Sequence, residues 1–318
     1  MPDTLTHDHA DTPSTHASSG DQFPPTSIAR IQTELIGWYA GNARDLPWRK
    51  PNVAPWAILV CEVMSQQTPV SRVAPAWHAW LEQWPTPEAL AHASPAEVIV
   101  AWDRLGYPSR ALRLRDCARR IVERHGGQVP SDRSELLALP GIGAYTADAV
   151  LAFAFQIRTT VLDTNIRRVL ARWHGEALPA PSEKPVERIR ATHFVPESAQ
   201  ESAQWNAAIM EFGALVCTAK SPRCDECIAS QWCAWRHNGY PEDTYRHTRK
   251  TQKFTGTLRE ARGQIMAPLR RAGESTLSYA ELHAAATSNP LFDSALASLV
   301  ADGLIEQTES GYRLPQNA

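Results

Sequence analysis

The stretch LPGIGAYTA at residues 139–147 decides the fold of this chain. Gly141 and Gly143 stand between a short predicted helix at residues 131–140 and a long run of small and apolar residues. Glycine permits a tight turn and lets the backbone approach a ligand closely. The free N–H groups at the start of the second helix then form a site for an anion such as phosphate. The stretch predicts a helix–hairpin–helix, although two spaced glycines alone could serve any turn between helices.

The apolar run that begins at this hairpin ends in one carboxylate, Asp163. Thr164, Asn165 and two arginines follow it. An aspartate before a helical segment can be its N-cap, because the side chain accepts a hydrogen bond from a free backbone N–H. A carboxylate can also stabilise a cation that forms during a reaction. The two roles can coexist, and the stretch alone leaves both open.

A second carboxylate, Glu62, lies in the segment CEVMSQQTPVSRV at residues 61–73, within an apolar helical stretch. Poor solvation raises the pKa of a carboxyl group, so that the group can donate a proton near neutral pH. Two carboxylates in different environments can divide an acid role from an ionised one. Glu62 is therefore a candidate for the acid role, and Asp163 for the role of an ionised carboxylate.

Residues 28–236 are predicted to be mostly helical. The segment SPAEVIVAWDRLGY, for example, offers Ser94 as an N-cap with Glu97 three residues later, and it stops at Gly106. After a polar linker, residues 256–318 predict three helices and a two-stranded hairpin, which is the plan of a winged helix. The third of these helices is apolar and acidic, so we expect it to have a structural or protein-contact role. The fold class is all-α with a small C-terminal α+β domain.

Four of the six cysteines lie within 17 residues, in the spacing C-x6-C-x2-C-x5-C: Cys217, Cys224, Cys227 and Cys233. Four thiolates this close in sequence can bind one metal centre, and both zinc and a [4Fe–4S] cluster accept such a set. Disulfides are not expected in a cytoplasmic chain. Cys61 and Cys117 lie in apolar helical contexts and are predicted to be buried as small hydrophobic residues.

Composition excludes some classes of protein. No apolar run is long enough to span a membrane, and residues 1–27 have no hydrophobic segment and are predicted to be a disordered tail. His7, His9 and His16 in this tail could bind a metal, but a solvated tail is the simpler interpretation. The net charge of −2 does not point to nucleic acid, yet seven arginines in residues 104–124 could bind phosphate or cover solvated helix faces. We expect a cytoplasmic protein.

The hairpin, the cysteine loop and the motifs LPWR, EVMSQQT and LGYPSRA occur in the order typical of the helix-hairpin-helix DNA glycosylases, and the chain resembles this superfamily over residues 28–236. The resemblance implies two helical subdomains with a catalytic cleft between them. One is a six-helix barrel of residues 56–160 that contains the hairpin. The other is an iron–sulfur cluster domain of residues 28–55 and 161–236. A linker of residues 237–255 and the winged-helix-like domain of residues 256–318 follow.

Glu62 in EVMSQQT, with LPWR upstream, resembles the MutY-type adenine glycosylases, which remove adenine opposite 8-oxoguanine. The resemblance implies that Glu62 protonates adenine and that Asp163 stabilises the sugar cation or forms a transient adduct. Tyr145 and Asn165 would form hydrogen bonds around these groups. Tyr145 stands where many relatives carry the lysine that forms a Schiff base. We therefore expect a monofunctional glycosylase.

The same resemblance implies the DNA contacts. Gln66 and Gln67, followed by Thr68, would enter the duplex near the lesion, and Tyr107 would insert beside 8-oxoguanine. The pocket for adenine would include Trp48 and Arg49, while Gly141 and Gly143 hold phosphate. The four clustered cysteines would bind a structural [4Fe–4S] cluster, with Lys220 and Arg223 facing phosphate. The expected partner is double-stranded DNA with adenine mispairs, bound by a monomer associated with the nucleoid.

Three positions depart from the pattern of the family: Ser65, Pro108 and Thr164. None of them removes a reacting group. The winged-helix-like domain stands where many relatives carry a Nudix-like domain, so recognition of the base opposite adenine is expected to rest on the helical body. Two alternatives stay open: a T:G mismatch glycosylase of the same superfamily, and a non-catalytic iron–sulfur redox sensor that binds DNA.

Overall fold

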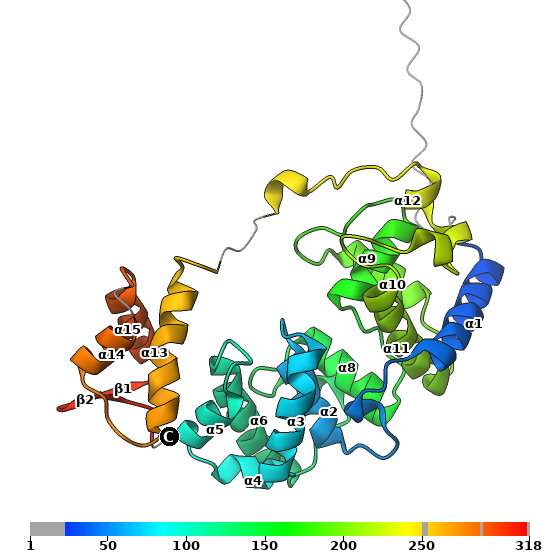
Figure 1. Cartoon of the computed structure of the whole chain (residues 1–318). Helices are drawn as coiled ribbons and strands as arrows, with labels where there is room; N and C mark the ends of the chain where they lie inside the picture. The colour runs from blue at the N-terminus through cyan, green and yellow to red at the C-terminus, as the bar shows by residue number, and fades with distance from the viewer. Residues whose placement is uncertain (1–22, 250–253, 287–288, 317–318) are drawn as a thin grey trace, which may run out of the picture.

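A computed structural model describes residues 23–249, 254–286 and 289–316 of the chain. Figure 1 shows a predominantly helical molecule with one small hairpin near the C-terminus. The α-helices are α1 (Pro25–Asn42), α2 (Pro55–Ser65), α3 (Val70–Gln83), α4 (Pro87–His92), α5 (Pro95–Trp102), α6 (Ser109–His125), α7 (Arg133–Leu137), α8 (Ala144–Phe155), α9 (Thr164–Trp173), α10 (Pro185–His193), α11 (Ala199–Leu215), α12 (Ala234–His237), α13 (Leu258–Ala272), α14 (Tyr279–Ala285) and α15 (Phe292–Ala301). Short 3-10 turns are η1 (Pro47–Arg49), η2 (Cys224–Glu226), η3 (Ser230–Trp232) and η4 (Arg246–Thr248), and the strands are β1 (Glu306–Thr308) and β2 (Gly311–Arg313).

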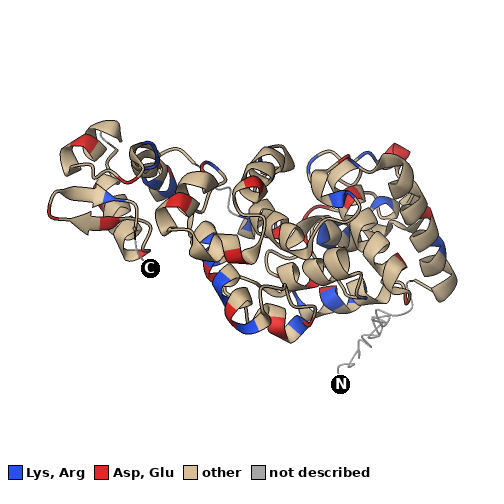
Figure 2. Ribbon diagram, turned by 90° about the horizontal axis from the view of Figure 1, so that it is seen from below, with Lys and Arg blue, Asp and Glu red and all other residues tan. Residues whose placement is uncertain are grey.

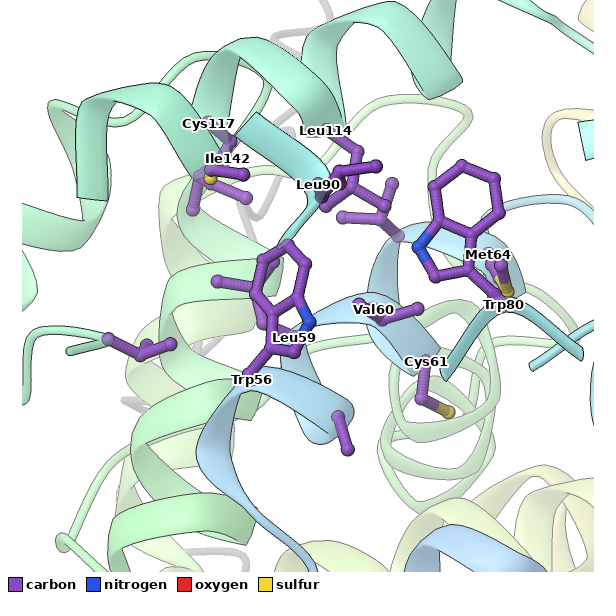
Figure 3. Packing of buried hydrophobic residues seen from close by; sticks show 14 of the residues in the cluster. Trp56, Leu59, Val60, Cys61, Met64, Trp80, Leu90, Leu114, Cys117 and Ile142 are labelled. Carbon is purple, nitrogen blue, oxygen red and sulfur yellow. The ribbon is translucent and has the colours of Figure 1, made fainter. Parts of the chain in front are cut away.

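The first hydrophobic core is built around α2. Nine of the 11 residues of α2 are buried, because its sequence is apolar on every face. Figure 3 shows Trp56 and Leu59 of α2 within a core to which Trp80 of α3 and Leu114 of α6 also contribute. A helix buried on all sides carries Glu62 into the interior with it, and this is what places a carboxyl group there.

The second core joins α1, α9 and α11, and α8 lies between the two cores. Val150 and Leu151 of α8 pack into the first core, whereas Ala149 and Ala152 pack into the second. The apolar run after the hairpin is explained by this position, since α8 has a core on two of its sides. Its C-terminal end leads the chain to Asp163 at the start of α9.

The C-terminal unit consists of α13, α14, α15 and the antiparallel pair β1–β2, as the sequence predicted. Leu277 forms an isolated antiparallel bridge with Tyr312, which ties the segment before α14 to the hairpin. The unit has its own buried cluster, and Ala96 and Ile99 of α5 belong to that cluster as well. All-α architecture with a small C-terminal α+β unit is thus confirmed.

The Ser94–Glu97 capping box of α5 is present, but α5 ends at Trp102 rather than at Gly106. Most of the expected tail, including its three histidines, lies outside the described residues. Phe23 is buried and α1 begins at Pro25, so the last residues of that tail are ordered. No described helix is long and apolar enough to cross a membrane.

The arginines of α6 do not form one solvated face. Arg110 and Arg115 are buried, and Arg115 and Arg119 donate hydrogen bonds to the backbone oxygens of Ala93 and Ala91. Figure 2 shows basic and acidic positions interspersed over the ribbon. The basic run therefore serves in part to join α6 to its neighbours within the barrel. Cys61 and Cys117 are buried, as predicted.

Candidate active site

Glu62 is a buried carboxyl group with one side-chain hydrogen bond given by the structure. Its side chain is 8% exposed, and the Tyr145 hydroxyl donates a hydrogen bond to Glu62 Oε2 at 2.8 Å. Burial raises the pKa of Glu62 to about 7, the bond from Tyr145 lowers it, and the nearby charge of Asp163 raises it. Glu62 can therefore be protonated near neutral pH and donate that proton.

Asp163 is the N-cap of α9 and accepts hydrogen bonds from two groups. The backbone N–H of Ile166 donates to Oδ1 at 2.6 Å, and Asn165 Nδ2 donates to Oδ2 at 2.8 Å. Burial raises the pKa of Asp163, while these bonds and the charge of Arg168 lower it. Arg168 also donates to Asn165 Oδ1 at 2.8 Å, which fixes the direction of the amide. The capping role is thus observed, and it holds the carboxylate in one orientation.

Close helix packing supports this arrangement at Gly213 of α11. A Cβ atom on Gly213 would lie 2.8 Å from Asn165 Cβ and 3.0 Å from Asn165 O. Arg168 also donates to the oxygen of Gly213 at 2.7 Å. Any larger residue would push α9 away from α11 and displace Asn165.

Tyr145 occupies the first turn of α8, immediately after the hairpin, and is half-buried. Burial raises its pKa well above the ordinary value, and the charges of Glu62 and Asp163 raise it further. Tyr145 is therefore a neutral hydrogen-bond donor at neutral pH. The structure brings Tyr145, Glu62 and Asp163 together from α8, α2 and the start of α9.

A second buried carboxylate, Glu211, organises the segment that contains Arg49. Glu211 is fully buried; Arg44 donates to it through Nε and Nη2, and Arg49 Nη2 donates to Oε2 at 2.9 Å. These bonds and charges lower the pKa of Glu211 to about 2 against the effect of burial. Trp48 packs edge-on against Trp77, with 5.9 Å between ring centroids.

Sequence reasoning missed Arg44 and Glu211. The signal was available, because Glu211 interrupts an apolar helical stretch in the same way as Glu62 does. Arg49 connects the two acidic groups, since it is bonded to Glu211 and its charge lowers the pKa of Glu62. Arg49 is thereby held beside the carboxyl groups by a network that short motifs do not reveal.

The loops at residues 66–68 and 105–107 are tied together by Arg110, another residue that the sequence analysis did not single out. Arg110 donates to the backbone oxygens of Gln66, Leu105 and Gly106 at 2.7–3.0 Å and to Thr68 Oγ1 at 3.2 Å. Burial lowers the pKa of Arg110 to about 10, so it remains charged at neutral pH. Thr68 is buried and bonded within this network.

Two side chains of these loops are exposed. Gln67 is exposed and has a φ of 54°, and Tyr107 is 38% exposed with a φ of 48°. Gln66 is half-buried and its amide donates to Thr146 Oγ1 at 3.4 Å. Left-handed backbone at a non-glycine residue is uncommon and is held by surrounding structure. Gln67 and Tyr107 are therefore the side chains of these loops that face solvent.

The two glycines of the hairpin differ in backbone conformation and in the space around them. Gly141 has a φ of 78°, and a Cβ on it would meet Arg113 Cβ at 3.0 Å, so the fold requires glycine at this position. Gly143 is the N-cap of α8 with an ordinary φ of −98°, and no other atom lies within 4 Å of where its Cβ would be. Open space over a helix N-terminus leaves room for the backbone of a bound phosphodiester.

The four clustered cysteines line one pocket together with Arg172 and Trp235. Arg172 Nη1 donates to Cys217 Sγ at 3.1 Å and to the oxygen of Thr218 at 2.8 Å. Among the residues described, no three His, Cys, Asp or Glu side chains are placed to hold a single metal ion. Nearby, Lys220 and Arg223 are exposed, and Arg223 pairs with Glu226.

Comparison with known proteins places this arrangement in a family. Residues 60–194 match the HhH-GPD superfamily of base excision DNA repair proteins. The fold agrees: a thermostable thymine-DNA glycosylase superposes with a TM-score of 0.61 at 26% identity, covering 66% of this chain and 97% of that one. An endonuclease III–DNA complex gives a TM-score of 0.58 at 22% identity, with 67% and 97% covered.

Curated relatives define the family more narrowly. An adenine DNA glycosylase of Mycolicibacterium smegmatis is 48% identical over 280 residues, which is 87% of this chain and 93% of the relative. Another from Mycobacterium tuberculosis H37Rv is 46% identical over 286 residues, covering 89% and 93%. This chain therefore belongs to the adenine DNA glycosylase family and is a base-excision-repair enzyme. The alternative of a non-catalytic redox sensor is wrong.

Proposed function

We propose that the enzyme hydrolyses the N-glycosidic bond of adenine in double-stranded DNA at A:8-oxoguanine and A:G mispairs. The observation that carries this proposal is Glu62, a buried carboxyl group with a pKa raised to about 7 and bonded to the Tyr145 hydroxyl. Departure of a purine is assisted by protonation of the base, and a neutral carboxylic acid can supply that proton. Thymine, the base removed by a T:G glycosylase, offers no basic ring nitrogen to such an acid.

In the proposed mechanism Glu62 gives its proton to adenine while the bond between C1′ of the sugar and the base breaks. The sugar is left as an oxocarbenium-like cation, and the Asp163 carboxylate stabilises that charge. Asn165 and the N–H of Ile166 hold the carboxylate in place. Water then adds to C1′ and loses a proton, which restores the acid form of Glu62, and the products are free adenine and an abasic site.

Tyr145 makes the reaction monofunctional in this proposal. A phenol cannot form the imine with the sugar that a lysine would form, so no strand cleavage follows base release. The expected product is an intact strand with an abasic site that breaks only on treatment with alkali. Borohydride added during the reaction should trap no covalent complex between the protein and DNA.

The proposed DNA contacts come from the exposed loops and the hairpin. Gly143 at the N-terminus of α8 faces open space suited to a phosphate. Gln66 and Gln67 would enter the duplex near the lesion pair, and Tyr107 would insert beside 8-oxoguanine. These insertions offset part of the cost of unstacking, on the order of a few kcal/mol. Trp48 and Arg49 would line the pocket that receives the base.

We also propose a structural [4Fe–4S] cluster held by Cys217, Cys224, Cys227 and Cys233. The fit is supported by the four thiols that surround one pocket and by the Arg172 guanidinium, which donates to Cys217 and so favours its thiolate. A [4Fe–4S] cluster would be held by four cysteine thiolates, and this pocket offers four. When bound, the cluster would fix the loop that presents Lys220.

The test of function is excision by purified full-length protein under single-turnover conditions. Adenine placed opposite 8-oxoguanine or G should be released, and Glu62→Gln and Asp163→Asn should lose this activity while still binding the duplex. Wild-type rates in either variant would refute the two-carboxylate mechanism. Preferential release of thymine from a T:G duplex would instead favour the second candidate function.

Separate measurements address the remaining proposals. Iron and sulfide analysis should give about four of each per chain, and Cys227→Ser should lower both; stoichiometric zinc would contradict the cluster. Light scattering tests the proposed monomer. Limited proteolysis should cut within the proposed linker of residues 237–255, between the helical body and the C-terminal domain, if the proposed boundaries are correct. The proposed cytoplasmic, nucleoid-associated location is tested by microscopy of a tagged chain.

A further inference from the structure

The C-terminal unit packs on the side of the barrel formed by α5 and α6. Ile265 and Leu269 of α13 are fully buried in a cluster that also contains Ala96 and Ile99 of α5, and Leu112 of α6 packs against it. Figure 1 shows α13 standing next to α5. Because the two parts share a hydrophobic cluster, α13 has a defined position on the barrel.

The two barrel helices that take part in this cluster are those that flank the loop at residues 103–108. This loop carries Tyr107, and its backbone has left-handed φ values of 41° at Asp103, 82° at Gly106 and 48° at Tyr107. Such values are costly for residues other than glycine, and they persist where neighbouring groups hold the chain. The loop is therefore an element whose conformation depends on its surroundings.

Arginines of α13 lie at both ends of this loop. The guanidinium carbon of Arg259 is 4.7 Å from the centroid of the Tyr107 ring, and its Nη2 is 3.8 Å from where a Cβ on Gly106 would lie. At the other end, burial lowers the pKa of Arg270 and the charge of Asp103 opposes that effect. The C-terminal unit thus meets the loop through charged groups as well as through its core.

Arg110 of the barrel also approaches the Tyr107 ring, at 5.8 Å, and it donates to the oxygens of Leu105 and Gly106. Arg110 fixes the loop backbone from within the barrel. Arg259 contacts the exposed ring itself and comes from a different domain. A cation over an aromatic face is attracted to it, and the contact restricts the directions that the ring can adopt.

We propose that the C-terminal domain holds Tyr107 in the orientation in which it enters the DNA stack, and that Arg259 is the positioning residue. This proposal rests on the proposed function, in which Tyr107 fills the duplex beside the base opposite adenine. The C-terminal domain acts here on the barrel of its own chain and reads no base itself. Arg259 therefore affects mispair binding through Tyr107 and leaves the chemistry at Glu62 unchanged.

The experiment measures the full-length chain with a duplex that carries 8-oxoguanine opposite a non-hydrolysable adenosine analogue. We expect Arg259→Ala to raise the dissociation constant about threefold to fivefold, the size of one exposed cation–π contact. The single-turnover rate on adenine at saturating enzyme should stay unchanged. Arg259→Lys, which keeps the cation, should recover part of the affinity. Arg271→Ala, an exposed arginine on the same helix, is the matched control and should have no effect.

A double-mutant cycle with Tyr107→Ala separates positioning from direct DNA contact. If Arg259 acts through Tyr107, then Arg259→Ala has no further effect on affinity when Tyr107 is already alanine. The proposal would be overturned if the losses of DNA affinity from the two substitutions add and if Arg259→Ala also lowers the salt dependence of binding by the amount of about one phosphate contact. Arg259 would then bind DNA directly. If Tyr107→Ala itself binds like wild type, the proposed role of Tyr107 fails. If only Arg259→Ala binds like wild type, the positioning role alone fails.

Discussion

The proposed donation of a proton by Glu62 gives the reaction a specific dependence on pH. The pKa of Glu62 is raised to about 7, and in the proposed mechanism its protonated form is the active one. About nine-tenths of the enzyme is then competent at pH 6 and about one-tenth at pH 8, so the rate falls about tenfold between these values. Because Glu62 must carry a proton to act as the acid, activity is lost as the pH rises through the pKa of Glu62.

The substitution Tyr145→Phe tests what sets the pKa of Glu62. The Tyr145 hydroxyl donates to Glu62 at 2.8 Å and favours the carboxylate, so its removal should raise the pKa of Glu62 further. One hydrogen bond to a charged group contributes about 1.5 kcal/mol or more, and one pKa unit corresponds to about 1.4 kcal/mol. We therefore expect the falling limb of the profile to move upward by about one unit.

The assay is excision at enzyme concentrations below saturation, measured from pH 5 to pH 9, because the profile then reports the free enzyme. At pH 8 the Phe variant should keep about half of its own low-pH rate, whereas wild type keeps about one-tenth. A falling limb at the same pH in both proteins, or one moved downward in the variant, would refute the assigned acid and its bond to Tyr145.

Three further variants test the scaffold of the site. Asp163→Asn should keep the N-cap and a nearly unchanged melting temperature but lower the single-turnover rate by about 10³-fold, the loss typical of one transition-state electrostatic group; retained activity would show that the cation is stabilised elsewhere. Gly213→Ala should destabilise the fold by about 1–3 kcal/mol in urea denaturation and slow excision, since its Cβ would meet Asn165 at 2.8 Å. Gly37→Ala, in α1 with free space around it, is the control and should not destabilise. Gly143→Ala should fold normally and bind DNA more weakly, and unchanged DNA affinity would contradict a phosphate at the hairpin.

Local sequence patterns predicted a large part of this molecule. The order of helices, the capping box at Ser94 and the helix-helix-helix-hairpin plan of the C-terminal unit follow from hydrophobic period and turn chemistry, which act over a few residues. The environment of Glu62 could be predicted for the same reason, since an apolar segment around a carboxyl group implies burial. The predicted end of α5 was wrong by four residues, because a polar turn after Trp102 stops the helix before Gly106.

The sequence by itself thus determined which segments are helical, which carboxyl group is buried and which thiols lie near one another. Only the tertiary structure decided that Tyr145 bonds to Glu62 across 83 positions and that Glu211 holds Arg49 across 162. It also decided that Arg259 reaches Tyr107. The physical reason is that a periodic pattern records whether each residue faces a core, whereas a contact between distant residues depends on how whole helices pack against one another.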